Sequence, residues 1–236
     1  MLSPVKAALE DLLRNRRLHV DGPPLRGTDR RLQPLPTGIA AIDALLAGGL
    51  PRGHVSEVYG PASSGRTAVA LAVVAQTTRA GALAAWIDPA DRFDPAFAVE
   101  AGVVLPRLLW LRGDPRERAI SGLGGAASAA GTLLGSGLFD IVALDLIGLA
   151  AEARRLPGST WIRLQRMIEA QPTALLLLGP AHLARGPSGV SLALQPGTLR
   201  WSGERGPGRL LRGREVEARS GPYTARVARF ELQACH

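Results

Sequence analysis

A short glycine-rich segment constrains the fold of this chain more than any other feature. Residues 60–67 read GPASSGRT, directly after an apolar run that ends at Tyr59 and before a long run of small apolar residues. A strand, a loop of the form G-x-x-x-x-G-K-[ST] and a helix together make a phosphate cradle, because backbone N–H groups and a helix N-terminus face one anion. The segment therefore predicts a phosphate-binding loop in an α/β domain.

One position of this loop departs from the pattern, since Arg66 stands where lysine is expected. Lysine is a compact charge that reaches the β- and γ-phosphates, whereas a guanidinium group is planar, larger and differently directed. We expect Arg66 to attract phosphate but to position the γ-phosphoryl group poorly for hydrolysis. A retained turn without any ligand is the alternative.

A strand-end carboxylate follows the loop in the expected order. The apolar run 139–144 ends in Asp145, which fits the carboxylate that orients Mg²⁺ beside a phosphate loop. Thr67 and Asp145 are therefore the candidate metal ligands, although Asp145 could also be an ordinary turn residue. The candidate nucleotide-binding residues are Gly60, Ser63, Ser64, Gly65, Arg66, Thr67 and Asp145.

The rest of the chain alternates between strand-like and helix-like segments. Expected strands are 55–59, 83–87, 108–111, 139–144 and 173–178; expected helices are 39–46, 65–79, 94–101, 115–134 and 161–170. This alternation predicts a mostly parallel sheet covered by helices on both faces. Three further strands, 198–202, 209–218 and 223–232, predict an antiparallel C-terminal extension. We expect Trp86, Trp110 and Trp201 to pack on or beside these strands.

The N-terminal segment has a different character. Residues 3–18 can form an amphipathic helix, with Ser3 as N-cap and Pro4 as the first helical residue. Residues 21–36 are rich in proline, glycine and charge, and predict a linker. We therefore divide the chain into an N-terminal helix and linker, 1–36, and a core domain, 37–236. The candidate partner-binding stripe is Val5, Leu9, Leu12 and Leu13.

Composition excludes several classes and points to an anionic partner. The single cysteine excludes a disulfide scaffold, and neither a bilayer-spanning run nor a signal peptide is visible, so we expect a cytoplasmic protein. The net charge is +8 and only one of the 28 cations is lysine, which could reflect codon usage. Residues 185–236 nevertheless carry nine arginines against four glutamates. The candidate DNA-binding residues are Arg154, Arg155, Arg185, Arg205, Arg209, Arg212 and Arg214.

Several motifs together resemble the ATPase core of the RecA recombinases. They are 35–38 (LPTG), 42–43 (ID), 48–53 (GGLPRG), 57–61 (EVYGP), 86–88 (WID) and 93–95 (FDP). The similarity spans about residues 37–232. Within that superfamily the compact, basic, lysine-poor chain is most similar to the ImuA family, also called SulA-like, whose members are RecA-like accessory proteins of bacterial translesion synthesis.

The resemblance implies that parts of the hydrolytic machinery are altered together. Ala90 stands at the position of the RecA glutamate that activates water, and Gly179 and Pro180 stand near its glutamine sensor. The DNA-binding loops are also short. The implied function is a degenerate accessory protein of SOS-induced, error-prone DNA synthesis. Its implied partners are an ImuB-like inactive Y-family polymerase adaptor, an error-prone DNA polymerase and RecA. ATP and Mg²⁺ are possible cofactors, or the protein binds neither.

Two other functions stay open at this point. The chain could be an active, DNA-stimulated ATPase that remodels RecA filaments, with Asp91 as a substitute base. It could also be a SulA-type cell-division inhibitor, although blocking a protein needs no phosphate loop.

Overall fold

The structure is a computed structural model that describes residues 33–113, 122–153, 155, 157–169, 171–184, 189–203, 206, 208–221 and 226–234. The expected N-terminal helix and its stripe of Val5, Leu9, Leu12 and Leu13 lie outside these residues. Leu35, in the segment expected to be a linker, forms a bridge with Leu50 and is buried in the core. No helix within the described ranges is both long and apolar enough to cross a membrane.

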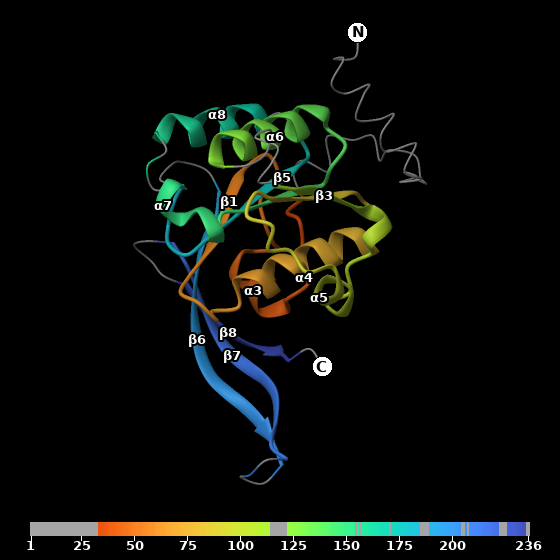
Figure 1. Ribbon diagram of the computed structural model, residues 1–236, viewed down its shortest axis with the longest axis vertical. Helices are drawn as coiled ribbons and strands as arrows, with labels where there is room; N and C mark the ends of the chain where they lie inside the picture. The colour runs from red at the N-terminus through yellow and green to blue at the C-terminus, as the bar shows by residue number, and fades with distance from the viewer. Residues whose placement is uncertain are drawn as a thin grey trace.

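One eight-stranded sheet organises the molecule (Figure 1), with the strand order β3-β2-β4-β5-β1-β6-β7-β8. The strands are β1 (Val55–Tyr59), β2 (Ala84–Asp88), β3 (Leu108–Arg112), β4 (Ile141–Asp145), β5 (Ala174–Gly179), β6 (Ser191–Ser202), β7 (Leu210–Ser220) and β8 (Arg226–Gln233). The pairs from β3 to β6 are parallel, whereas β6–β7 and β7–β8 are antiparallel. The predicted mostly parallel sheet with an antiparallel C-terminal extension is confirmed.

The centre of the sheet explains its near-continuous apolar sequence. Every residue of β4 and β5 is buried, because helices cover both faces at this point. The helical segments are α3 (Ala40–Leu45), α4 (Arg66–Arg79), α5 (Pro95–Glu100), η1 (Leu105–Arg107), α6 (Leu123–Ser136), η2 (Ile147–Leu149), α7 (Ala150–Ala153) and α8 (Gly158–Ile168). One apolar cluster joins α3, α4 and α5 to the first face, and a second joins α6 and α8 to the opposite face.

Local signals explain where the helices beside the loop begin. Gly65 precedes α4 with a φ of +89°, a conformation that glycine adopts without steric cost. The carboxylate of Asp94 accepts hydrogen bonds from the N–H groups of Ala96 and Phe97, and Pro95 is the first residue of α5. Both helices thus start at the same end of the sheet, where the parallel strands β1, β2 and β4 finish.

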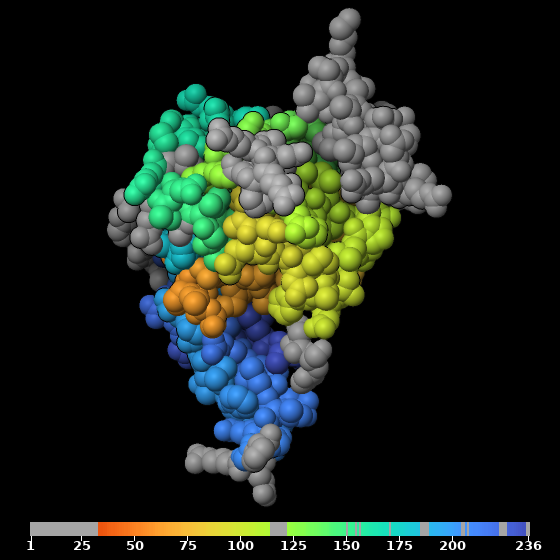
Figure 2. Space-filling model, viewed as in Figure 1, coloured from red at the N-terminus to blue at the C-terminus, as the bar shows by residue number. Residues whose placement is uncertain are grey.

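The antiparallel extension is longer than its sequence pattern indicated. The strand β6 begins at Ser191, several residues before the expected 198, and its first part pairs with β1. A register shift between Pro196 and Leu199 then bends the strand. Beyond this bend β6 and β7 project from the core, which Figure 2 shows as a blue protrusion below the helical layers. We call the part formed by residues 199–202 and 210–213 the ribbon.

Candidate functional site

The phosphate loop joins β1 to α4 in a shape that requires glycine at two positions. A Cβ atom on Gly60 would overlap the carbonyl oxygen of Leu194 in β6, and Gly65 has a positive φ. Ser63 also has a positive φ, of 59°. This curl and the first turn of α4 have the shape that the sequence pattern predicts, whereas anion binding by their N–H groups stays a prediction.

The guanidinium group of Arg66 turns back into the protein at the start of α4. Its Nη1 atom donates to the carbonyl oxygen of Gly60 at 2.6 Å and to that of Gly179 at 3.0 Å. Only 8% of the residue is exposed. Burial lowers the pKa of Arg66; Asp145 opposes this effect and Arg92 adds to it. Arg66 therefore holds the start of the loop against the end of β5 through two neutral carbonyl groups.

A cavity of about 290 Å³ opens beside the loop and brings Arg66, Thr67 and Asp145 together. Asp145 is 5% exposed and accepts a hydrogen bond from the N–H group of Ile147 at 2.9 Å. Burial raises the pKa of Asp145, while the Ile147 hydrogen bond lowers it. The structure thus places both candidate metal ligands on one cavity with the arginine that replaces lysine.

The cavity holds charges of both signs. The Thr67 hydroxyl and the Asp145 carboxylate are oxygen donors of the kind that Mg²⁺ takes. The guanidinium groups of Arg66 and Arg92 line the same cavity, and the carboxylates of Asp94 and Asp145 balance their charge. Within the described ranges, no three His, Cys, Asp or Glu side chains form a group that could hold a metal ion.

A second cavity, of about 410 Å³, separates the phosphate loop from the antiparallel extension. Its apolar lining is Phe97, Leu199, Leu211 and Leu232. The side chain of Leu232 in β8 packs against the open face of Gly65. On the same side, Nη1 of Arg214 in β7 donates to the carbonyl oxygen of Ser63 at 2.6 Å. The two cavities share the loop, so an apolar space adjoins the cavity that holds Arg66, Thr67 and Asp145.

The possible substitute base does not face the phosphate loop. Asp91 is at the surface, with a φ of +53°, and it forms an ion pair with Arg112 in β3. Ala90 packs close to Gly148, where it presents only a methyl group. The carboxylate of Asp91 is therefore bound to β3 through its ion pair with Arg112.

Sequence reasoning missed Arg92, which lies on the turn between β2 and α5. Its side chain lines the smaller cavity with Arg66 and Thr67. The signal that could have found it is positional, since Arg92 follows the carboxyl end of a parallel strand adjacent to β4.

A further buried charge lies on the other face of the sheet. Glu57, in the middle of β1, is 1% exposed. Its carboxylate accepts hydrogen bonds from the N–H groups of Leu183 at 2.6 Å and Ala184 at 3.3 Å, and it lies 2.7 Å from Nδ1 of His182. Burial raises the pKa of Glu57, and the Leu183 hydrogen bond is the largest opposing effect. The carboxylate therefore anchors the segment that follows β5.

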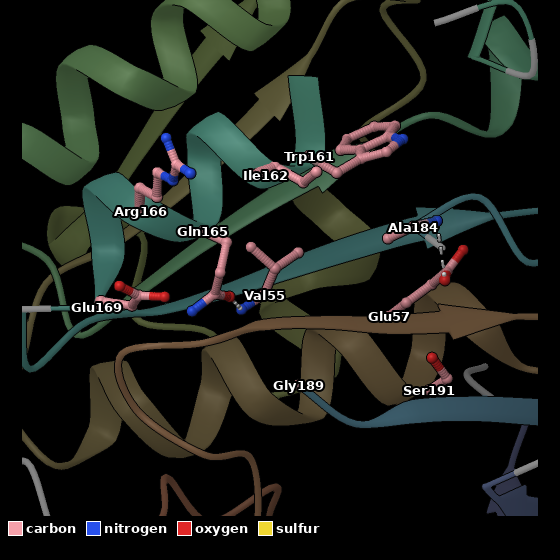
Figure 3. A pocket seen from close by; sticks show the side chains of 10 residues that line it. All are labelled: Val55, Glu57, Trp161, Ile162, Gln165, Arg166, Glu169, Ala184, Gly189 and Ser191. Atoms are coloured by element: carbon pink, nitrogen blue, oxygen red, sulfur yellow. Dashed lines mark hydrogen bonds between the residues drawn. The ribbon is translucent and has the colours of Figure 1, made fainter. Parts of the chain in front are cut away.

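Figure 3 shows the cavity that this carboxylate borders, about 240 Å³ in volume, between β1 and α8. Trp161, Ile162 and Gln165 of α8 line one side, and Ala184 lies opposite them. The amide of Gln165 is already used, because its Oε1 atom accepts the N–H group of Val55 at 2.9 Å. This cavity and the phosphate loop lie on opposite faces of the sheet.

Four of the candidate DNA-binding arginines lie within the described residues. Arg214 contacts the phosphate loop, whereas Arg209 and Arg212 lie at the ribbon. Arg155 follows α7 at the surface. Arg154, Arg185 and Arg205 lie outside the described residues.

One expectation about the tryptophans is wrong. Trp86 is fully buried and Trp110 is half-buried, but Trp201 is 42% exposed on the ribbon, where the Arg209 guanidinium lies 5.0 Å from its ring centroid. Trp201 lies opposite Leu211 in the ribbon, which extends past the end of the β7–β8 pairing at Gly213. Strand pattern alone did not show where the partner strand stops.

Comparison with known proteins agrees with this geometry. The model of the RecA N-terminal domain family matches residues 25–159. The RecA protein of Paenarthrobacter aurescens is 40% identical over 151 residues, which cover 61% of this chain and 42% of that protein. The RecA protein of Acidothermus cellulolyticus is 38% identical over 162 residues, which cover 66% of this chain and 45% of that protein. The matches thus span less than half the length of these relatives. The chain belongs to the family of the RecA N-terminal domain.

Proposed function

We propose that this chain is a RecA-family accessory protein that does not turn over ATP efficiently and acts by assembling with other proteins and with DNA. The observation that carries this proposal is the geometry of Arg66. Its Nη1 atom is bound to the carbonyl oxygens of Gly60 and Gly179, so the cation is committed to the protein rather than to a transferring phosphoryl group.

The neighbouring residues support the same proposal. Ala90 has no side-chain proton acceptor, and the carboxylate of Asp91 is paired with Arg112. Efficient hydrolysis needs a positioned group to orient the attacking water, which contributes about 10²–10⁴-fold to the rate. Gly179 and Pro180, at the end of β5, also have no polar side chain.

We place the protein in SOS-induced, error-prone translesion synthesis, as an ImuA-like component. The support is the resemblance of its sequence, together with the short segments that take the place of the RecA DNA-binding loops. The proposed partners are an ImuB-like polymerase adaptor, an error-prone DNA polymerase and RecA. An ATPase that uses Asp91 finds no comparable support, because that carboxylate forms an ion pair with Arg112.

The first test measures phosphate release from ATP with Mg²⁺, with and without single-stranded DNA. We expect release by the unmodified chain to be at least about 100-fold slower than by a RecA protein assayed in parallel. The double variant Arg66→Lys, Ala90→Glu restores the loop lysine and the glutamate of RecA proteins. It is assayed beside the unmodified chain for comparison. DNA-stimulated release that disappears in Asp145→Ala would contradict the proposal.

The second test addresses the partners by co-purification of the full chain with each proposed protein. Replacing Leu9 and Leu12 by Asp should abolish binding of at least one partner, because it removes the expected apolar stripe. Replacing Lys6 and Arg14 by Asp, off that stripe, is the control. Binding that survives the first replacement, or no binding to any of the three proteins, would refute the proposed assembly role.

A further inference from the structure

The cavity between β1 and α8 lies on the face of the sheet opposite the phosphate loop, and no step of the proposed function uses it (Figure 3). We call it the α8 cavity. Its volume of about 240 Å³ is below the roughly 300–1,000 Å³ of most ligand and cofactor sites. A space of this size suits a single side chain of another protein better than a cofactor.

The α8 cavity is held open by the polar side chain of Gln165. Its Oε1 atom accepts the N–H group of Val55 at 2.9 Å, and its Nε2 atom donates to the carbonyl oxygen of Gly53 at 3.1 Å. On the opposite wall, a Cβ atom on Gly189 would overlap the carbonyl oxygen of Val55, so only glycine lets the chain pass this close to β1. The walls are therefore fixed before an occupant arrives, which lowers the entropic cost of binding.

The inner part of the α8 cavity offers an apolar surface. Trp161 is 5% exposed, and Val55 and Ala184 line the same space. Two polar side chains beside them are already in use, since the amide of Gln165 binds the backbone and the carboxylate of Glu57 accepts N–H groups of the segment after β5. A polar group placed beside them would lose water without gaining a partner, which costs free energy. The inner part therefore favours an apolar occupant.

The rim of the α8 cavity carries an exposed apolar side chain and two charges. Ile162 is 46% exposed, Arg166 lies one turn further along α8, and Glu169 directly follows the helix. Neither charged side chain forms an ion pair within the part of the chain that the structure describes. The rim thus presents an apolar group, a cation and a carboxylate in order along one side of α8.

These charges favour a protein over a nucleic acid. A polyanion gains its affinity from several cations that contact successive phosphates, whereas here one arginine stands beside two glutamates, Glu57 and Glu169. The aliphatic side chain of Ile162 also offers no aromatic face on which a base could stack. Arg166 and Glu169 can instead pair with a carboxylate and a cation that are about one helical turn apart in a protein segment.

We propose that the α8 cavity docks an apolar side chain of a protein partner, in a segment that also carries an acidic residue facing Arg166 and a basic residue facing Glu169. The inference rests on the proposed function and deepens it, because it names a surface through which the chain holds one of its proposed partners. Trp161 and Ile162 enclose the docked side chain, and the two charges fix its orientation. Anchors that fill a pocket in this way carry most of the binding energy of protein interfaces.

The test measures the Kd of the full chain for each of the three proposed partner proteins by calorimetric titration. Ile162→Asp puts a charge at the apolar rim and should weaken binding of at least one partner by about tenfold or more. Met167→Asp is the matched control, because Met167 is 39% exposed on the same helix but lies close to Gly131 of α6. This control, and the conservative Ile162→Leu, should stay within about threefold of the unmodified chain.

A second pair of variants tests the charges of the rim. Arg166→Glu and Arg163→Glu change the charge of α8 equally, but only Arg166 lines the cavity. Arg166→Glu should weaken binding of the same partner about tenfold, and Arg163→Glu less than about threefold. All the replaced side chains are exposed, so urea unfolding should give the same midpoint for each variant and show that lost binding is not lost folding.

Several results would overturn the inference. Partner binding that Ile162→Asp leaves unchanged, or that Met167→Asp weakens equally, would do so and would leave the proposed assembly role intact. No binding to any of the three proteins would refute the inference and that role together. Weaker binding of single-stranded DNA by Ile162→Asp, with partner binding intact, would identify nucleic acid as the occupant. Loss of a dimer of the chain in the same variant, again with partner binding intact, would identify a second copy.

Discussion

The buried carboxylate of Glu57 lies 2.7 Å from Nδ1 of His182, a residue 125 positions later in the chain. The contact fixes the segment that leaves β5 to the centre of the sheet. Burial raises the pKa of Glu57 above its ordinary value of 4.5, so the folded protein holds this proton more tightly than the unfolded chain. The contribution of this proton to stability is therefore complete below pH 4.5 and is lost as the pH rises through the raised value.

We expect Glu57→Gln to reduce this pH dependence. The glutamine keeps an acceptor for the Leu183 N–H group but cannot ionise. As the pH rises above 4.5, the free energy of unfolding should fall less in the variant than in the unmodified protein. Urea unfolding at several pH values measures this difference. Parallel curves for the two proteins would show that Glu57 does not titrate with a raised pKa.

Replacement of Arg66 should destabilise the fold even without a ligand. Arg66→Ala leaves the carbonyl oxygens of Gly60 and Gly179 without their donor, and each lost hydrogen bond to a charged group costs about 1.5–3 kcal/mol. We expect a loss of about 3–6 kcal/mol in the free energy of unfolding. Arg66→Lys keeps a donor and should lose less. Denaturant unfolding provides the measurement, and an unchanged midpoint for Arg66→Ala would be inconsistent with the structure.

Gly65 should tolerate no side chain. A Cβ atom there would meet Leu232, and the φ of +89° disfavours any other residue. Gly65→Ala should therefore lower the free energy of unfolding by about 2 kcal/mol or more. The control is Gly135→Ala in α6, where the space is open and alanine should stabilise the helix by up to about 1 kcal/mol. Equal effects of the two substitutions would mean that β8 does not pack on the loop.

The ribbon should carry most of the DNA affinity if the protein binds DNA. Trp201 is exposed beside Arg209, and base stacking on such a ring contributes about 1–3 kcal/mol. We expect Trp201→Ala and Arg209→Ala to weaken single-stranded DNA binding about tenfold, and Arg209→Ala to reduce the salt dependence. The control is Arg229→Ala, because that arginine is paired with Glu217. Fluorescence anisotropy at several salt concentrations measures these affinities. If Arg229→Ala weakens binding equally, the ribbon does not carry most of the DNA affinity.

Local sequence patterns predicted helices and strands well where the apolar residues of the pattern are also the buried residues of the structure. The segment 55–59 and the run ending in Asp145 are strands because their apolar residues are buried, and the glycines around residue 65 force the loop. The start of β6 was missed because Ser191–Leu194 is short and its pairing partner, β1, lies more than 130 positions earlier. Its burial depends on strand order, which a local pattern does not contain.

The site was predictable in its parts but not in its contacts. The loop residues follow from one motif, whereas the acceptor Gly179 is 113 positions from Arg66 and meets it only because β5 lies beside β1. The Glu57–His182 pair could not be predicted for the same reason, because its two residues are also far apart in the sequence. Arg92 was missed because its place after a strand is its only signal in the sequence, and only the structure shows that Asp88 and the aromatic rings hold that turn.

The bond between Arg66 and two carbonyl groups has a consequence for how the loop responds to its surroundings. The protein solvates this cation with its own fixed dipoles, much as a macrocyclic ether solvates a metal ion. Mobile salt ions screen charges at the surface, but they reach a buried ion–dipole contact poorly. The shape of the loop should therefore hardly change with ionic strength, whereas attraction between the exposed arginines and a polyanion should fade as salt is added.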